Sequence, residues 1–223
     1  MRTLIFSLMV SVFLIGCINF NPKRSEKEKR SEAHVVVTKD STDDSITQDG
    51  PHLKFKNVPI DGPLDKFIAR MVRSGFKVEE ETAGQAILSG DFADFKECMV
   101  YVETLKGKDL VSKITVRFPN QNQWEYLYGD YQHLKELLTV KYGKPSSCVE
   151  KFQGAHGMTP TDDNNRMHYV HFDCCKYETL FATDKGEISL RIGHESVIRA
   201  FVMLSYKDKI NSNIIKKHAI DDL

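Results

Sequence analysis

The sequence lacks an excess of charge of either sign, because its 31 lysines and arginines balance its 31 aspartates and glutamates. Nucleic-acid-binding domains tend to carry a basic patch and a high isoelectric point, so this balance argues against nucleic acid as a partner. Apolar residues make up 41% of the 223 residues and charged residues 28%. Both fractions are ordinary for a globular protein, so the composition predicts a folded domain.

The chain also lacks the short motifs that mark common catalytic sites. It contains no G-x-S-x-G nucleophile elbow, no P-loop, no H-E-x-x-H zinc motif and no C-x-x-C pair. These absences favour a non-enzymatic binding or assembly protein that needs no cofactor.

No apolar run reaches the 20 or so residues that cross a bilayer. The most apolar stretch, Leu4–Ile15, follows the basic Arg2 and has the length of a signal-peptide h-region. It ends in Leu14-Ile15-Gly16-Cys17, which resembles the lipobox of bacterial lipoproteins. A plain signal peptide ends in a small-x-small pattern instead, and Leu14 occupies the first small position.

The resemblance to lipoproteins implies that residues 1–16 are removed and that Cys17 is acylated with palmitate and further acyl chains. Several chains hold a protein durably in a membrane, whereas one binds reversibly. The membrane is thus a partner through Cys17, and the location is the bacterial cell envelope. The residue after Cys17 is Ile18. An aspartate at this position would indicate a different location for the lipoprotein, so isoleucine favours the outer membrane, facing the periplasm.

Residues 17–50 have the composition of a linker. Asn21–Glu32 (NPKRSEKEKRSE) contains almost no apolar residue, and such a segment buries too little surface to offset the entropy of folding. The block Lys23–Arg30 holds five basic and two acidic residues. It is either a contact to anionic headgroups or a solvated spacer, and the interrupting Glu26 and Glu28 favour the spacer.

The rest of the chain shows the patterns of an α+β fold. Apolar residues at helical spacing predict two helices, with the stripes Leu64/Phe67/Ile68/Met71/Val72 and Leu127/Tyr131/Leu134/Leu138. Alternating residues predict strands over 53–58, 76–79, 85–92, 97–105, 110–118, 146–152, 166–174, 177–183, 187–192 and 197–206, with a short helix after Asp208.

The order of these elements suggests two tandem units, 51–120 and 121–223, each with one helix packed on an antiparallel β-meander. This order resembles the β-lactamase-inhibitor-like and outer-membrane-assembly lipoproteins, whose helices cover one face of such a sheet. The phrase HLKFKNVPIDGPLDKFIARMVRSGF, residues 52–76, is also similar to the opening of uncharacterised lipoproteins from gut Bacteroidetes. Both resemblances imply a fold and an address, and neither implies a reaction.

One cluster of metal-ligating residue types lies between His168 and Cys175. On the predicted strand, His171, Asp173 and Cys175 share one face and offer three ligand types that suit zinc. The alternative is a strand whose polar side faces solvent, and it is favoured because the spacing matches no standard zinc pattern. This cluster is the candidate centre of an alternative function, an envelope metal-binding protein or enzyme.

Four cysteines follow Cys17 in the sequence. Export permits disulfides, and Cys148 with Cys174 is the candidate pair, with Cys175 as the other choice for Cys148. Buried free thiols are an equal alternative, since cysteine is among the most buried residue types.

Within residues 51–223 the segment 153–165 is the longest stretch without a predicted helix or strand, and loops of this length are often functional. Its candidate binding residues are His156, Asp162, Asp163 and Asn164, whose oxygens suit calcium but lack the spacing of an EF-hand. Nearby in the chain, Trp124, Tyr126 and Tyr128 suit either a protein contact or the core. We expect an envelope protein as the partner of this loop or of the exposed sheet face.

The lipobox makes a direct prediction about Cys17. Cys17→Ser removes the thiol that receives the acyl chain, so the variant should accumulate as unprocessed precursor and should not incorporate labelled palmitate. The measurement is metabolic labelling of cells that express the wild-type or the variant chain. Equal labelling of the two chains would contradict the lipoprotein hypothesis.

Overall fold

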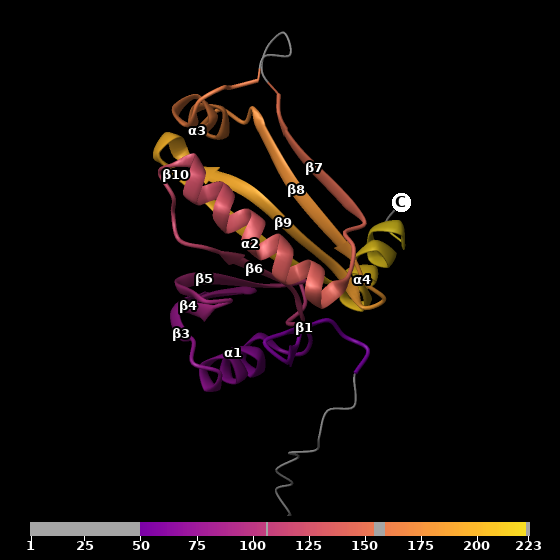
Figure 1. Cartoon of the computed structure of the whole chain (residues 1–223). Helices are drawn as coiled ribbons and strands as arrows, with labels where there is room; N and C mark the ends of the chain where they lie inside the picture. The colour runs from indigo at the N-terminus through magenta and orange to yellow at the C-terminus, as the bar shows by residue number, and fades with distance from the viewer. Residues whose placement is uncertain (1–49, 106, 154–158, 222–223) are drawn as a thin grey trace, which may run out of the picture. The chain divides into compact units, whose positions relative to one another are not determined.

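The alternating segments of the sequence build one large antiparallel sheet. The computed structural model describes residues 50–105, 107–153 and 159–221. Eight strands lie in the order β3-β4-β5-β6-β10-β9-β8-β7, and each neighbouring pair is antiparallel (Figure 1). These strands are β3 (Lys77–Thr82), β4 (Gln85–Phe92), β5 (Phe95–Thr104), β6 (Val111–Arg117), β7 (Ser147–Phe152), β8 (Cys175–Ala182), β9 (Gly186–Glu195) and β10 (Arg199–Asp208).

Helices precede, interrupt and follow these strands. They are α1 (Leu64–Arg73) before β3, α2 (Trp124–Tyr142) before β7, α3 (Asp163–His171) between β7 and β8, the short 3-10 helix η2 (Ser196–Ile198) between β9 and β10, and α4 (Lys209–Asp221) after β10. The predicted α+β class with antiparallel strands is therefore confirmed, as are both predicted helices and the helix after Asp208.

One face of the sheet is buried beneath helices. In β6, Ile114 and Val116 are fully buried, whereas Lys113 and Arg117 point to the opposite face because side chains alternate along a strand. α2 lies across β9 and β10 on the buried face (Figure 1). It buries the whole predicted stripe, which is Leu127, Tyr131, Leu134 and Leu138.

The stripe of α1 is buried in four of its five predicted positions. Leu64, Phe67, Ile68 and Met71 pack toward β3 and β4. Val72 is 46% exposed, because it lies at the margin of the stripe in the last turn of a helix of only ten residues.

The predicted strand over 53–58 is instead a small hairpin of β1 (Lys54–Phe55) and β2 (Val58–Pro59). Lys56 and Asn57 form its turn with φ values of 45° and 65°. Two residues in the left-handed region fit the tight turns that join two adjacent strands. The hairpin places Phe55 in the core, 5.0 Å from the ring of Phe92 and 5.5 Å from that of Tyr206.

The predicted strand over 166–174 is wrong, because most of this segment is the helix α3. Asp162 caps the helix by accepting a hydrogen bond from the N–H of Asn165 at 3.0 Å. Met167 and Val170, three positions apart, bury one side of the helix. The aromatic and β-branched residues that suggested a strand are thus accommodated on a helix.

A buried carboxylate joins the two ends of the folded chain. Asp208, at the end of β10, accepts hydrogen bonds from the backbone N–H groups of Leu53 and Asn211, both at 2.9 Å. The Nδ1 atom of His52 lies 3.2 Å from the same carboxylate. The side-chain amide of Asn211 donates to the carbonyl oxygens of Ile60 and Val111. One polar network therefore connects the N-terminal hairpin, β6, β10 and α4.

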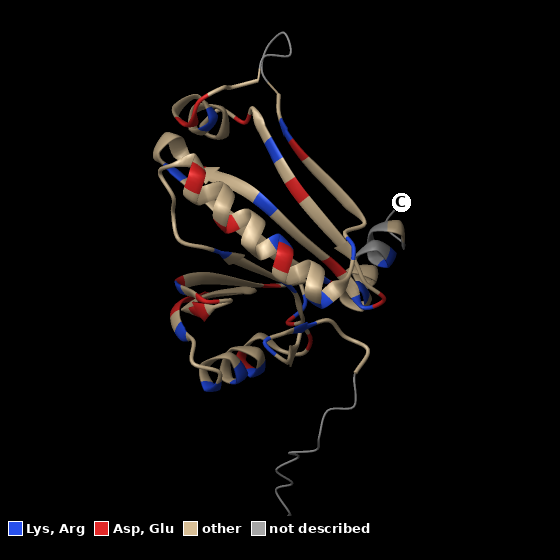
Figure 2. Ribbon diagram, viewed as in Figure 1, with Lys and Arg blue, Asp and Glu red and all other residues tan. Residues whose placement is uncertain are grey.

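The described residues all belong to one compact unit. The predicted boundary between 120 and 121 falls within it, between β6 and α2. The predicted signal peptide (1–16), the predicted acylation site Cys17 and nearly all of the predicted linker 17–50 lie outside the described residues. Among the described residues no helix is long and apolar enough to span a membrane. Figure 2 shows residues of both charge signs on α2 and on the strands, as the even composition predicts.

The Asp208 network predicts a large effect on stability. Asp208→Ala leaves buried donors without an acceptor, and we expect a loss of about 3 kcal/mol in the free energy of unfolding. Asp184→Ala is the control, because Asp184 is an exposed carboxylate in the β8–β9 turn, and it should change that value by less than about 0.5 kcal/mol. Denaturant unfolding measures both, and equal values for the two variants would contradict the role of Asp208.

Candidate functional site

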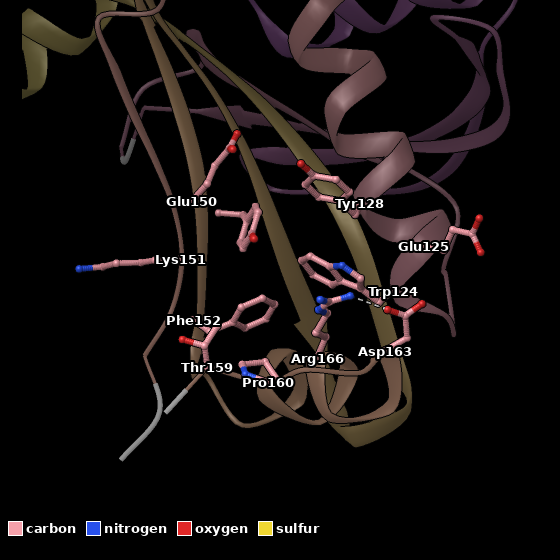
Figure 3. Close-up of a pocket in the computed structure, with 11 residues that line it drawn as sticks. Trp124, Glu125, Tyr128, Glu150, Lys151, Phe152, Thr159, Pro160, Asp163 and Arg166 are labelled. Carbon is pink, nitrogen blue, oxygen red and sulfur yellow. Dashed lines mark hydrogen bonds and ion pairs between the residues drawn. The ribbon is translucent and has the colours of Figure 1, made fainter. Parts of the chain in front are cut away.

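A cleft of about 670 Å³ opens between the start of α2, the end of β7, β8 and the start of α3 (Figure 3). Its walls combine aromatic rings with charged side chains. The lining residues are Trp124, Tyr128, Phe152 and Tyr177, the charged Glu125, Glu150, Lys151, Asp163 and Arg166, and Thr159 with Pro160.

The aromatic rings form the floor of this cleft. Trp124 and Tyr128 are four residues apart on α2 and therefore lie on the same side of the helix, with stacked rings 5.4 Å apart. Trp124 also contacts Phe152 at 5.1 Å and Tyr177 at 5.2 Å between ring centres. Such pairs add about 0.5–1.5 kcal/mol each beyond area burial. Trp124 is only 5% exposed, whereas Tyr128 is 37% exposed and offers its ring to a ligand.

Cations hold two carboxylates at the rim of the cleft. Asp163 pairs with Arg166 at 2.8 Å along α3, as the dashed line in Figure 3 marks. Glu150 pairs with Lys135 of α2 at 2.5 Å. Burial opposes the ionisation of Glu150, but the hydrogen bond and the charge of Lys135 outweigh burial and lower its pKa. Both carboxylates are thus held in ion pairs, and Glu150 remains charged near neutral pH.

A buried tyrosine hydroxyl lies beneath the floor of the cleft. The hydroxyl of Tyr131 lies 2.6 Å from that of Thr179 in the interior. Burial raises the pKa of Tyr177 to about 12, so this side chain also stays a neutral phenol. The floor is therefore neutral and aromatic, and the charged side chains lie at its rim.

The predicted binding loop lies partly at this cleft. Asp163 lines it, Asp162 is occupied as the cap of α3, and Asn164 lies in the first turn of that helix. Thr159 and Pro160 contribute loop residues to the wall. His156 lies outside the described residues. The carboxylate of Asp162 bonds both the backbone and the side chain of Asn165, so it caps the helix.

The three candidate metal ligands do not converge. Because 163–171 is helical, His171 ends α3, Asp173 lies in the following turn and Cys175 begins β8. The side chain of Asp173 is 91% exposed and bonds His194 at 3.0 Å. Burial raises the pKa of Cys175 to about 12. Within residues 50–105, 107–153 and 159–221, no three His, Cys, Asp or Glu side chains are placed to hold a metal ion.

The predicted disulfide between Cys148 and Cys174 is not formed, and both thiols are free. The reason is the strand register, which places Cys148 opposite Thr179 and Phe152 opposite Cys175. Cys148 is therefore four positions from Cys175 and five from Cys174, or roughly 13 and 17 Å along the strands. A disulfide needs Cα atoms within about 7 Å of each other, so the alternative pair with Cys175 is excluded as well.

Comparisons with protein-family models, with curated proteins and with solved structures found no match to this chain. The evidence for a binding site here is therefore the geometry of the cleft alone. The sequence alone pointed to Trp124, Tyr128 and Asp163. It did not point to Phe152, Tyr177 or Arg166, since these reach the cleft only through the pairing of β7 with β8 and the formation of α3.

The cysteine environments predict the reactivity of each thiol. With Cys17 acylated, four thiols should react in the denatured chain without reductant, and fewer would contradict the free cysteines. In the native protein Cys148 is exposed and should react fast. Cys98 and Cys175 should react slowly, because burial raises their pKa to about 11 and about 12 and only the thiolate attacks. Thiol titration with a chromogenic disulfide measures both, and Cys148→Ser should remove the fast phase.

Proposed function

We propose that this chain is a lipid-anchored protein of the bacterial outer membrane that faces the periplasm and acts as a non-enzymatic binding or assembly module. Cys17 carries the anchor, and the linker 17–50 gives the folded unit reach from the membrane. The lipobox Leu14–Cys17 supports the address. The aromatic cleft supports binding, and it is the observation that carries the function.

The chemistry of the cleft favours binding over catalysis. General acid–base catalysis needs a group poised to exchange a proton near neutral pH. Here Asp163 and Glu150 are held by Arg166 and Lys135, and Tyr177 keeps its proton. An apolar floor with a few convergent polar groups at its rim is typical of ligand sites, and aromatic residues are enriched in protein interfaces.

We also infer that the fold consists of two tandem α-then-β units that meet at β6 and β10. The mirrored strand order, with one helix ahead of each run of four strands, supports this interpretation. The second run departs from a plain meander because α3 is inserted between β7 and β8. That insertion supplies Asp163 and Arg166, so the binding cleft lies where the second unit differs from the first.

The test compares two tyrosines of α2. Tyr128 lines the cleft, whereas Tyr126 is 54% exposed and lies outside it. We expect Tyr128→Ser to lower chemical crosslinking of the full-length protein to its envelope partner at least tenfold, roughly the 1.4 kcal/mol that one aromatic contact supplies. Tyr126→Ser is the matched control and should crosslink like the wild type.

Quantitative mass spectrometry of the crosslinked envelope measures the yield for each variant. Thermal unfolding of both variants checks that the fold is intact. Equal partner recovery by the two variants would remove the cleft from the proposed function and leave only the anchor.

A further inference from the structure

The two edge strands of the sheet are protected to different degrees. An edge strand offers unpaired backbone groups, and proteins block such edges with charges and bulges. β3 has three consecutive glutamates, Glu79 to Glu81, and a register shift between Val78 and Glu80. β7 pairs with β8 without any shift over its six residues. It carries two charges of opposite sign, Glu150, which pairs with Lys135, and Lys151. β3 is blocked by three like charges and a register shift, and β7 is the less protected edge.

The hydrogen-bond alternation identifies the backbone groups at the less protected edge. The N–H of Gln153 donates to Cys174 at 2.7 Å, which continues the β7–β8 register, and that of Thr183 donates to Gly186 at 2.8 Å, which continues the β8–β9 register. In an antiparallel pair, bonded and non-bonded positions alternate. Odd-numbered residues of β7 therefore bond β8, and the N–H and C=O groups of Cys148, Glu150 and Phe152 point outward.

No strand of the described residues pairs with that outward side of β7. Glu150 and Phe152 also line the cleft with their side chains. A residue that pairs directly with either one projects its side chain from the same face of the sheet. A strand added at β7 would therefore place a side chain in the aromatic cleft, beside Tyr128 and Tyr177.

We propose that β7 binds an extended peptide segment of an envelope protein by strand addition, with one aromatic side chain of that segment seated in the cleft. This inference rests on the proposed function and names its class of partner. Main-chain hydrogen bonds supply affinity in this mode of recognition, and pockets for alternate side chains supply specificity. Proline does not suit the anchor position, because the anchor residue has to donate its own N–H to the edge.

The test uses a phage-displayed library of random dodecapeptides, selected on the full-length protein. We expect enriched peptides to share one aromatic residue flanked by β-branched residues. Synthetic peptides of that consensus should bind Glu150→Pro at least tenfold more weakly than the wild type. This substitution removes an outward N–H and leaves the β8 bonds in place, since proline is tolerated only where no ladder bond is lost. It also removes the Glu150 carboxylate from the cleft, so Glu150→Ala, which loses the carboxylate but keeps the N–H, is compared with it, and only the proline variant should lose the main-chain contribution to binding.

The matched control is Glu81→Pro in β3. The N–H of Thr104 donates to Gly84, so even-numbered residues of β4 bond β5 and odd-numbered ones bond β3. Gln85 and Ile87 therefore form hydrogen-bonded backbone pairs with Thr82 and Glu80. The N–H of Glu81, between these two, points outward at the other edge of the sheet. Glu81→Pro introduces the same change on the blocked edge and should bind the peptides like the wild type.

Hydrogen exchange of the wild-type protein gives a readout that needs no variant. Bound peptide should protect the amides of Cys148, Glu150 and Phe152, which are unbonded in the free protein. No aromatic consensus, unchanged exchange at these three amides, or equal binding by Glu150→Pro and the wild type would overturn the inference. Peptides that depend on Tyr128 without protecting β7 would overturn strand addition alone, and the proposed binding function would stand.

Discussion

The buried carboxylate of Asp208 is the constraint on which the rest of the fold depends. A charge out of water is costly unless hydrogen bonds satisfy it, and its donors come from both ends of the domain, His52 and Leu53 on one side and Asn211 on the other. The same contacts bring Phe55 onto Phe92 of β4 and Tyr206 of β10, strands that lie on opposite sides of β6. The two halves of the sheet therefore meet, at β6 and β10, beside one carboxylate at the end of β10.

The cleft is a consequence of how α2 covers the sheet. α2 packs mainly on β9 and β10, whereas β8 and β7 extend beyond it toward the edge (Figure 1). The helix-side residues of these outer strands, Phe152 and Tyr177, contact rings in the first two turns of α2, and Phe152 also contacts Tyr169 of α3. The cleft therefore lies at the start of α2, beside the start of the inserted helix α3.

Local pattern predicted the scaffold well, and it failed where tertiary contacts decide the structure. The stripes of α1 and α2 and the bounds of β4 follow directly from periodicity. The prediction of a strand over 166–174 was wrong. Tyr169, Val170 and Phe172 favour strands, but the cap at Asp162 and the burial of Met167 and Val170 select a helix. That single error also produced the expected face of His171, Asp173 and Cys175. The disulfide failed for a related reason, since a strand register is set by pairing and is not visible in the spacing of cysteines.

Only part of the cleft could be predicted from the sequence, because its residues come from four separate elements. Trp124 and Tyr128 are neighbours on one helix, so their spacing already suggests a common face. Phe152 and Tyr177 meet only after β7 and β8 pair in register. The fold keeps these rings partly exposed, although each Å² of apolar surface left in water forgoes about 25 cal/mol. A longer or shifted α2 would cover them and gain stability. An exposed aromatic floor beside the less protected strand edge is a costly arrangement for a purely structural sheet, and a bound partner would offset that cost by covering both at once.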